Sequence, residues 1–178
     1  MSSRAFDDPV LEERRRSALL HIRQYGDPVL RARAADVEQF DEALRREADA
    51  MAALMRDAHG VGLAAPQIGR SRRLIVFREA EEAPARALCN PRVVWESDER
   101  EVMGEGCLSI GEVVVDVERP VAVRISAQDL EGQPLEIAPE GFAARVLQHE
   151  IDHLDGILIL DRTDPEQRKE ALRALRGA

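Results

Sequence analysis

Two histidines and a glutamate near the end of the chain have the spacing of a hydrolytic metal site. In the stretch QHEIDHLDG, His149 and His153 are four residues apart, and Glu150 directly follows the first histidine. On a helix, residues four apart share a face, so both imidazoles would point to one place. Two neutral imidazoles bind a divalent ion, and the carboxylate can move the proton of a water held there. The pattern predicts metal-assisted hydrolysis, and a chance pair of core histidines is the alternative.

A catalytic metal usually takes three protein ligands, so a third ligand is required. Metzincins have a further histidine that would fall at Ile159, which cannot ligate. Cys107 lies in GEGCLSIG, where glycines allow the backbone to bring a side chain close to another element. We therefore predict Cys107 as the third ligand. The other candidates lie in less suitable surroundings and are His21, His59, Cys89, Glu166 and Glu170.

A set of one thiolate and two imidazoles has its own chemistry. The thiolate neutralises one of the two charges of a divalent ion, so the ion is a weaker Lewis acid than one held by histidines alone. An open fourth position would still hold and acidify a water. By donor softness and tetrahedral geometry alone, zinc is the expected metal.

The histidine pair needs a rigid helix, and the sequence predicts one over residues 142–154. Leu147, Ile151 and Leu154 form an apolar stripe that would pack into the core, and Gly156 suits the C-terminal cap. A second helix is predicted over 41–58, where apolar residues, methionines among them, recur at helical spacing and are expected in the core. A charged helix is predicted over 165–175.

The remaining apolar runs predict β-strands. They cover residues 72–77, 88–95, 99–103, 113–117, 121–127, 134–137 and 157–160. Because strands and helices do not alternate along the chain, the fold class is α+β. We expect one catalytic domain over residues 21–178, preceded by a polar extension over residues 1–20.

Composition narrows the classes of partner. The 178-residue chain has a net charge of −9 and only 3% aromatic residues, which argues against a nucleic-acid site. No segment approaches the roughly 20 apolar residues of a membrane span, and no signal or transit peptide is evident. Cys89 and Cys107 are therefore expected as free thiols in a cytoplasmic protein.

Three stretches together closely resemble the signature motifs of peptide deformylases. They are GVGLAAPQ (60–67), EGCLS (105–109) and QHEIDHLDG (148–156), and a looser similarity extends from about residue 22 to about residue 162. The resemblance implies an α+β fold with antiparallel sheets around a central helix that carries the histidines. It also implies the reaction, which is removal of the N-formyl group from the formylmethionine of newly made polypeptides, with release of formate.

The resemblance assigns a role to each matching residue. Cys107, His149 and His153 match the metal ligands, and Glu150 matches the general acid/base. The side-chain amide of Gln67 and the backbone N–H of Leu108 match the groups that polarise the formyl oxygen. Family members are often iron enzymes, so the resemblance implies Fe(II), with zinc, nickel or cobalt as metals found after purification. On this point it overrides the expectation of zinc.

Substrate contacts can also be assigned by the resemblance. Gly62 has no side chain, so a peptide could pair with this stretch like a strand. Val61 and Val146 are candidate walls of an apolar slot for the methionine side chain, with ordinary core packing as the alternative. Glu105 is expected to orient the site through a contact with Arg119.

The chain departs from many deformylases at two positions. Gly111 stands where many relatives have proline, and Val114 stands where some carry an arginine linked to the peptide beyond the methionine.

In some relatives the C-terminal helix docks on the ribosome, but the cationic residues here also suit a helix in solvent. Two other classes are alternatives, a general metalloprotease and a structural metal module without turnover. The second would need a fourth ligand such as Cys89 or His59.

Overall fold

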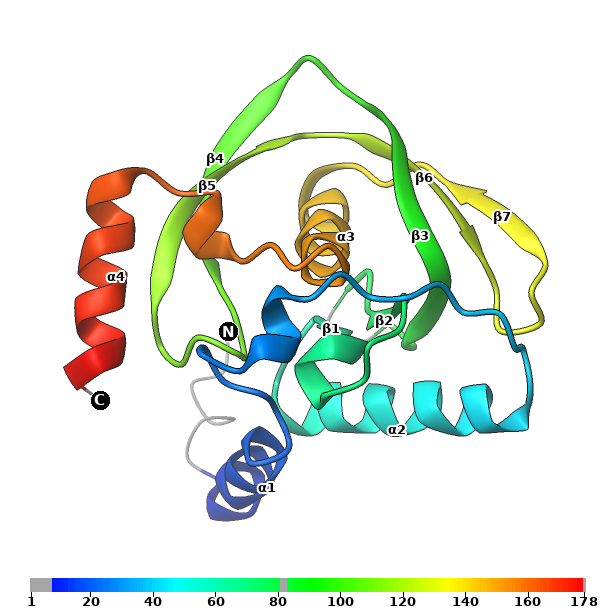
Figure 1. Ribbon diagram of the computed structural model, residues 1–178, viewed down its shortest axis with the longest axis horizontal. Coiled ribbons are helices and arrows are strands. Elements are labelled where there is room, and N and C mark those ends of the chain that lie inside the picture. The colour runs from blue at the N-terminus through cyan, green and yellow to red at the C-terminus, as the bar shows by residue number, and fades with distance from the viewer. Residues whose placement is uncertain (1–7, 81–82, 178) are drawn as a thin grey trace.

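One helix lies at the centre of the fold, surrounded by strands (Figure 1). The computed structural model describes residues 8–80 and 83–177. Helix α3 spans Gly141–Leu154, which confirms the helix predicted for the histidines. Its apolar stripe of Leu147, Ile151 and Leu154 is buried. Gly156 follows with φ of 74°, in the left-handed conformation that ends helices, and an added Cβ would lie 2.6 Å from the carbonyl oxygen of Arg31.

Two antiparallel sheets enclose α3. The larger has the order β1-β2-β3-β6-β7, and the smaller pairs β4 with β5. The strands span Gly62–Ala64 (β1), Leu74–Phe77 (β2), Arg86–Glu96 (β3), Arg100–Gly106 (β4), Val114–Pro120 (β5), Val123–Gln128 (β6) and Pro134–Ile137 (β7). β1 is an edge strand, and β4 has β5 as its single partner in the described part of the chain. Each of these strands therefore has one free edge.

Helix α2 packs on the side of the larger sheet away from α3. It spans Glu42–Asp57, and the side chain of Asp41 accepts a hydrogen bond from the Leu44 N–H at its start. Met51 and Met55 are fully buried against β1 and β2, as predicted for the methionine stripe. The α+β class is confirmed by this combination of helices and antiparallel sheets.

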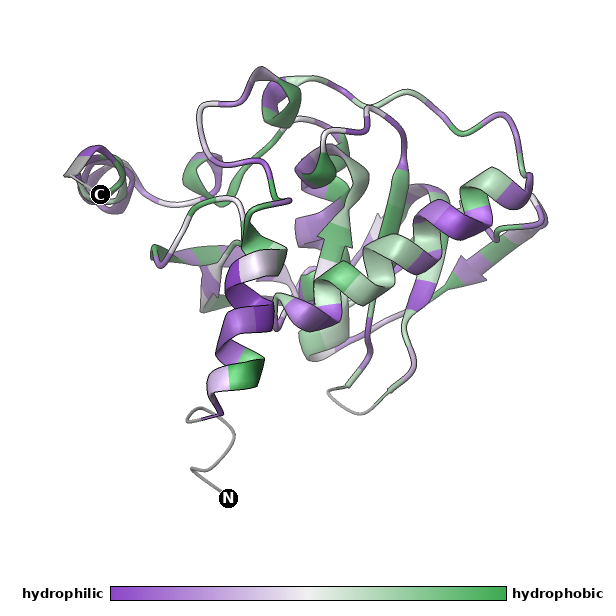
Figure 2. Ribbon diagram, turned by 90° about the horizontal axis from the view of Figure 1, so that it is seen from below, coloured by the Kyte–Doolittle hydropathy of each residue, from purple (hydrophilic) through white to green (hydrophobic). Residues whose placement is uncertain are grey.

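The first described helix, α1, spans Pro9–Leu19 (Figure 1). Most of its residues are hydrophilic (Figure 2), but Ala18 is only 5% exposed and packs with residues of α2. Residues 1–7 lie outside the described part of the chain. The boundary between an extension over 1–20 and a domain over 21–178 stays a prediction.

The strand predicted over residues 157–160 is wrong. Here the chain forms a 3₁₀ turn, η3 (Ile159–Asp161), because the carboxylate of Asp161 accepts a hydrogen bond from the Leu158 N–H and closes the turn. Two further 3₁₀ turns, which the sequence analysis did not predict, are η1 (Pro28–Arg31) and η2 (Ala65–Ile68). Apolar burial of Ile159 and Leu160 explains the strand-like pattern.

The last helix, α4, spans Pro165–Gly177 and lies beside the smaller sheet. Its Ala171 is buried in a cluster with Val115 and Val117 of β5, so one face belongs to the core. Its cationic residues are exposed. Within the described residues, every helix is too short or too polar to cross a membrane.

Candidate metal centre

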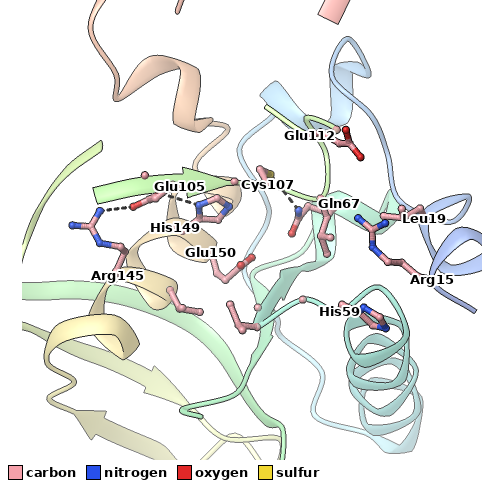
Figure 3. A pocket seen from close by; sticks show the side chains of 18 of the residues that line it. Arg15, Leu19, His59, Gln67, Glu105, Cys107, Glu112, Arg145, His149 and Glu150 are labelled. Carbon is pink, nitrogen blue, oxygen red and sulfur yellow. Dashed lines mark hydrogen bonds and ion pairs between the residues drawn. The ribbon is translucent and has the colours of Figure 1, made fainter. Parts of the chain in front are cut away.

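Cys107, His149 and His153 come together at one point. Their ligand atoms all lie within 4.8 Å of one another, and this is the one such cluster among the described residues. The sulfur of Cys107 lies 3.2 Å from Nε2 of His153. Figure 3 shows Cys107 facing His149 across the inner end of a cleft. The predicted ligand set is therefore assembled by the fold.

Two rigid elements deliver these ligands. His149 and His153 lie one turn apart on α3, and their rings meet edge to face with centroids 5.0 Å apart. Cys107 directly follows the last residue of β4, in a tight turn that is closed by the Ile110 N–H donating to the Cys107 carbonyl. The donor set fits a divalent cation, because a soft sulfur and two imidazole nitrogens converge at coordination spacing beside an open cleft.

Glu150 lies beside the ligands with an oxygen that has no partner. Its Oε2 is buried and accepts no hydrogen bond in the described part of the chain. The backbone of Gly62 is so close that an added Cβ would lie 2.4 Å from Oε1 of Glu150. Burial raises the pKa of Glu150 to about 7, against the opposing effect of the positive charges of His149 and Arg119. A carboxyl with such a pKa can both take and give a proton near neutral pH.

Glu105 orients His149 by a contact with its Nδ1 atom. Its Oε2 lies 3.1 Å from Nδ1 of His149, which leaves Nε2 for a metal ion. Arg119 binds both carboxylate oxygens, at 2.7 and 3.0 Å, so the contact predicted between Glu105 and Arg119 is present. Although burial opposes it, hydrogen bonds from His149 and Arg119 lower the pKa of Glu105 to about 2. Glu105 is therefore a carboxylate at any physiological pH.

The two imidazoles sit in opposite electrostatic environments. Burial disfavours a charged His149, but contacts with Cys107 and Glu105 outweigh it and raise the pKa of His149 well above its usual range. Burial, together with the charges of His149 and Arg119, lowers the pKa of His153. His153 is therefore a neutral donor, whereas a cation must displace a proton from His149 to bind it.

Gln67 and Leu108 border the same space. The side-chain oxygen of Gln67 accepts from the Ala64 N–H at 2.8 Å, which turns its amide nitrogen toward Ser109 Oγ at 3.2 Å and Cys107 Sγ at 3.8 Å. The Leu108 N–H donates to no acceptor among the described residues. Both groups are thus placed to donate to an oxygen bound beside Cys107.

The cleft that opens from this cluster has a volume of about 650 Å³. Val61, Gly62, Glu105 and Val146, all predicted from the sequence, contribute to its lining. The lining also includes residues that the sequence analysis did not assign to the site, among them Met103, Phe142, Arg145 and residues of α1.

Arg145 could have been found from its spacing. It precedes His149 by one helical turn and therefore lies on the same face of α3. Its guanidinium donates to Glu105 Oε1 at 2.7 Å and to the carbonyl oxygens of Val117 and Glu101 at 2.9 and 2.7 Å. Arg145 therefore joins α3 to the smaller sheet.

The rejected ligand candidates lie away from the cluster. Cys89 is buried in β3, and burial raises its pKa to about 11, so it is a neutral thiol. His59 lies at the end of α2, where it lines the cleft, and His21 is exposed. Neither histidine is among the residues that could hold a metal ion.

Two histidines and a glutamate on the central helix of an α+β fold, joined by a cysteine that follows β4, define a metal-dependent hydrolase. Comparison with known proteins agrees. The sequence model of the family "Polypeptide deformylase" matches residues 19–169. A peptide deformylase from Thermotoga neapolitana is 45% identical over 150 residues, which is 84% of this chain and 90% of the relative. Peptide deformylase 1 from Corynebacterium glutamicum is 44% identical over 90% of this chain and 96% of the relative.

The fold gives the same result. A crystal structure of a peptide deformylase from Legionella pneumophila superimposes with a TM-score of 0.83 at 41% identity, covering 88% of this chain and 92% of that one. The chain belongs to the peptide deformylase family, whose members remove the N-formyl group from the formylmethionine of new polypeptides. The family, the enzyme class and the reaction predicted from the three motifs are confirmed.

Proposed function

We propose that Cys107, His149 and His153 hold one divalent ion and that Glu150 moves the protons of deformylation. The observation that carries this proposal is the convergence of the three ligand atoms within 4.8 Å, next to a buried carboxylate oxygen without a partner. A bound ion would act as a Lewis acid that polarises the formyl group and makes a water more acidic. The native ion is proposed to be Fe(II), with zinc, nickel or cobalt as replacements, since sulfur and imidazole donors accept all four.

The substrate is proposed to bind as an extended strand between two free strand edges. β1 and β4 each have one unpaired edge, and Gly60, Gly62, Gly104 and Gly106 line the cleft from these two sides. A peptide backbone can approach glycines closely and pair with such edges. The formyl group then lies at the metal ligands, and the methionine side chain packs against the apolar wall of the cleft.

An apolar part of that wall suits methionine. Val61, Val146, Met103 and Phe142 all line the cleft, and Met103 and Phe142 have exposed fractions of 39% and 53% that a substrate would cover. Burial of a methionine side chain contributes roughly 1.5–3 kcal/mol. Side chains of this size and polarity favour an unbranched apolar residue over a charged one.

The chemistry of the protein groups follows from their positions. Glu150 accepts a proton from the attacking water as the new C–O bond forms at the formyl carbon. As the C–N bond breaks, Glu150 delivers that proton to the departing nitrogen, so the products are formate and a free amino terminus. The Gln67 amide and the Leu108 N–H donate to the oxygen on which negative charge develops. In related sites the loss of one such donor lowers the rate about 10²–10³-fold.

A pair of variants tests the proposal. In Glu150→Gln we expect metal content to stay the same and turnover of formyl-Met-Ala to fall about 10²–10⁴-fold, because proton transfer is lost while the ligands remain. In Cys107→Ala we expect metal itself to be lost. Metal content by elemental analysis and formate release with iron, nickel and zinc, measured without oxygen, distinguish the two.

Two control variants address the structural alternative. Cys89→Ser and His59→Ala should leave metal content unchanged, since neither residue belongs to the cluster. Loss of metal from either one, or near-normal turnover by Glu150→Gln, would contradict the proposed site.

The setting of the reaction is also a proposal. Formylated nascent chains are made in the cytoplasm or in organelles derived from bacteria, and we propose the cytoplasm for this enzyme. Docking of the C-terminal helix on the ribosome occurs in some relatives, and for α4 we propose the alternative, a charged helix in solvent. The exposed cationic residues of α4 make its outer face available for contact, and they equally suit a helix in solvent.

A further inference from the structure

Helix α1 lines the same cleft as the metal ligands. Arg15, Arg16, Leu19 and Leu20 contribute to the lining together with Cys107. Figure 3 shows Arg15 extending from α1 toward the cleft, on the side of Gln67 and opposite Arg145. The sequence predicted these residues to lie in an extension outside the catalytic domain, and the proposed reaction has no use for them.

The position of α1 relative to the site is fixed by the segment that follows it. The Arg23 N–H donates to the carbonyl of Gln67, and the Tyr25 N–H donates to the carbonyl of Ser109, both at 2.7 Å. The side chain of Gln24 donates to the carbonyl of Leu108 at 3.1 Å. These acceptors belong to the loops that carry the oxygen-polarising groups. Together with the burial of Ala18 against α2, these bonds hold the helix at the cleft.

The two guanidiniums are weakly engaged within α1. Nη1 of Arg15 lies 3.8 Å from Oε1 of Glu12. Nη1 of Arg16 lies 3.6 Å from Oε2 of Glu13, and both distances are too long for a hydrogen bond. Exposed pairs of this kind are worth about 0–1 kcal/mol. A carboxylate that presents both oxygens to a guanidinium binds it more strongly, so it can displace these partners. The Arg15 side chain is only 35% exposed, which reduces solvent screening.

The direction of the substrate decides what meets these arginines. Nothing precedes the formyl group, which lies at the ligands, and the methionine side chain occupies the apolar wall of Val61 and Val146. The rest of the cleft is left to the residues that follow the methionine. The arginine side of the cleft is therefore the exit side of the peptide.

We propose that Arg15 and Arg16, here called the α1 rim, bind a carboxylate of the peptide downstream of the formylmethionine. The inference rests on the proposed function. The carboxylate comes either from an acidic side chain or from the C-terminus of a short peptide. Because the protein as a whole carries a charge of −9, the rim acts as a local attraction against a general repulsion of acidic peptides.

Three peptides test the rim and separate the two sources. They are formyl-Met-Ala-Ser-amide, which is neutral, formyl-Met-Ala-Glu-amide, and formyl-Met-Ala-Ser with a free C-terminus. For the metal-loaded wild type we expect at least one carboxylate peptide to exceed the neutral one in kcat/KM by about three- to tenfold, through KM. An advantage of the glutamate peptide identifies a side-chain subsite, and an advantage of the free C-terminus identifies a chain-end subsite.

Variants of the rim connect this advantage to the arginines. Arg15→Ala with Arg16→Ala should remove it and leave kcat/KM for the neutral peptide unchanged, while the double lysine variant should keep most of it. Arg14→Ala is the matched control, because Arg14 is exposed and does not line the cleft. Salt near 1 M should also remove the advantage, since it shortens the screening length to about 3 Å.

A binding measurement gives a readout without turnover. In a Glu150→Gln background, calorimetry should show the same ratio of Kd values between carboxylate and neutral peptides, and the loss of that ratio in the rim variant. The inference is overturned if the wild type shows no advantage, if the double alanine variant keeps it, or if Arg14→Ala loses as much. In each case deformylation of the neutral peptide leaves the proposed function standing. If no peptide is deformylated, both this inference and the proposed function are contradicted.

Discussion

At Gly62 the backbone of β1 lies so close to the carboxylate of Glu150 that a methyl group would not fit between them. An added Cβ at Gly62 would lie 2.4 Å from Oε1 and 2.8 Å from the carboxyl carbon, and real Cβ atoms essentially never make contacts shorter than 3.0 Å. Glu150 is 4% exposed and is held on a central helix, so it has little room to give way. The position of Glu150 in the site therefore depends on the absence of a side chain at Gly62.

We therefore expect Gly62→Ala to lower kcat about 10²-fold, because a shift of the base by about 1 Å costs that much in alignment. Metal content should not change, since Gly62 does not contact the ligand atoms. Formate release measured beside elemental analysis and a thermal unfolding midpoint separates misalignment from misfolding. A variant with normal kcat would show that Glu150 moves freely.

The sequence predicted most of the residues that meet in this site, for different reasons. His149, Glu150 and His153 follow from the period of one helix. Cys107 required a choice, supported by glycines and then by the resemblance. Arg145 and the α1 rim were missed, because an arginine in an amphipathic pattern ordinarily indicates a solvated surface. Only the folded chain shows that Arg145 is buried beside Glu105.

At the scale of elements, buried charges connect four pieces of the chain. Arg119 of β5 donates to Glu105 of β4 and, at 2.9 Å, to Asp152 of α3. Asp152 also accepts a hydrogen bond of 2.6 Å from the guanidinium of Arg162, which follows η3. Arg119 is 4% exposed and Glu105 is 6% exposed, so these charges are shielded from water. The smaller sheet, which carries Cys107, is thereby tied to the helix that carries the histidines.

Replacing Arg119 by methionine should destabilise the fold by about 3–5 kcal/mol, because two buried carboxylates each lose one of their two guanidinium partners. Release of Glu105 should also weaken metal binding about 10–100-fold through His149. Urea unfolding and competition with a chelator measure the two effects. The control is Arg92→Met, which removes an exposed pair with Asp36 and should cost about 0–1 kcal/mol. Equal losses in both variants would contradict a special role for the buried network.

Predictions of elements succeeded where periodicity extended over many residues. α2 and α3 matched their predicted ranges to within a residue or so at each end, β7 matched its range, and β2 to β6 were found with shifted ends. β1 has three residues, too few for a pattern, although it forms one side of the cleft. Residues 157–160 are apolar because they pack under α4, and local hydrogen bonding turns them into η3 instead of a strand.

At the scale of the whole molecule, the charge of the protein is strongly negative while its C-terminal helix presents cations. Ala171 and Leu175 pack toward β5, so Lys169, Arg173 and Arg176 lie on the outer part of α4. Figure 2 shows this helix at the periphery, apart from α1. Removing the helix would uncover core residues, so its contacts are better tested by changing its charges.

Changing Lys169, Arg173 and Arg176 to serine should leave co-sedimentation with ribosomes unchanged if α4 is merely solvated, which is the outcome we expect. The control variant is Arg46→Ser with Arg56→Ser on α2, which removes exposed cations away from α4. A selective loss of co-sedimentation in the α4 variant, at moderate salt and with normal deformylation of a free peptide, would establish docking instead.

The ligands come from two elements that are made at different times. Cys107 directly follows β4, whereas His149 and His153 lie on α3, near the end of the chain. While residues 108–148 are being added, a growing polypeptide therefore holds the sulfur without either of its nitrogen partners. Any fragment left by interrupted translation before α3 is catalytically silent and has no centre with which to sequester a scarce ion.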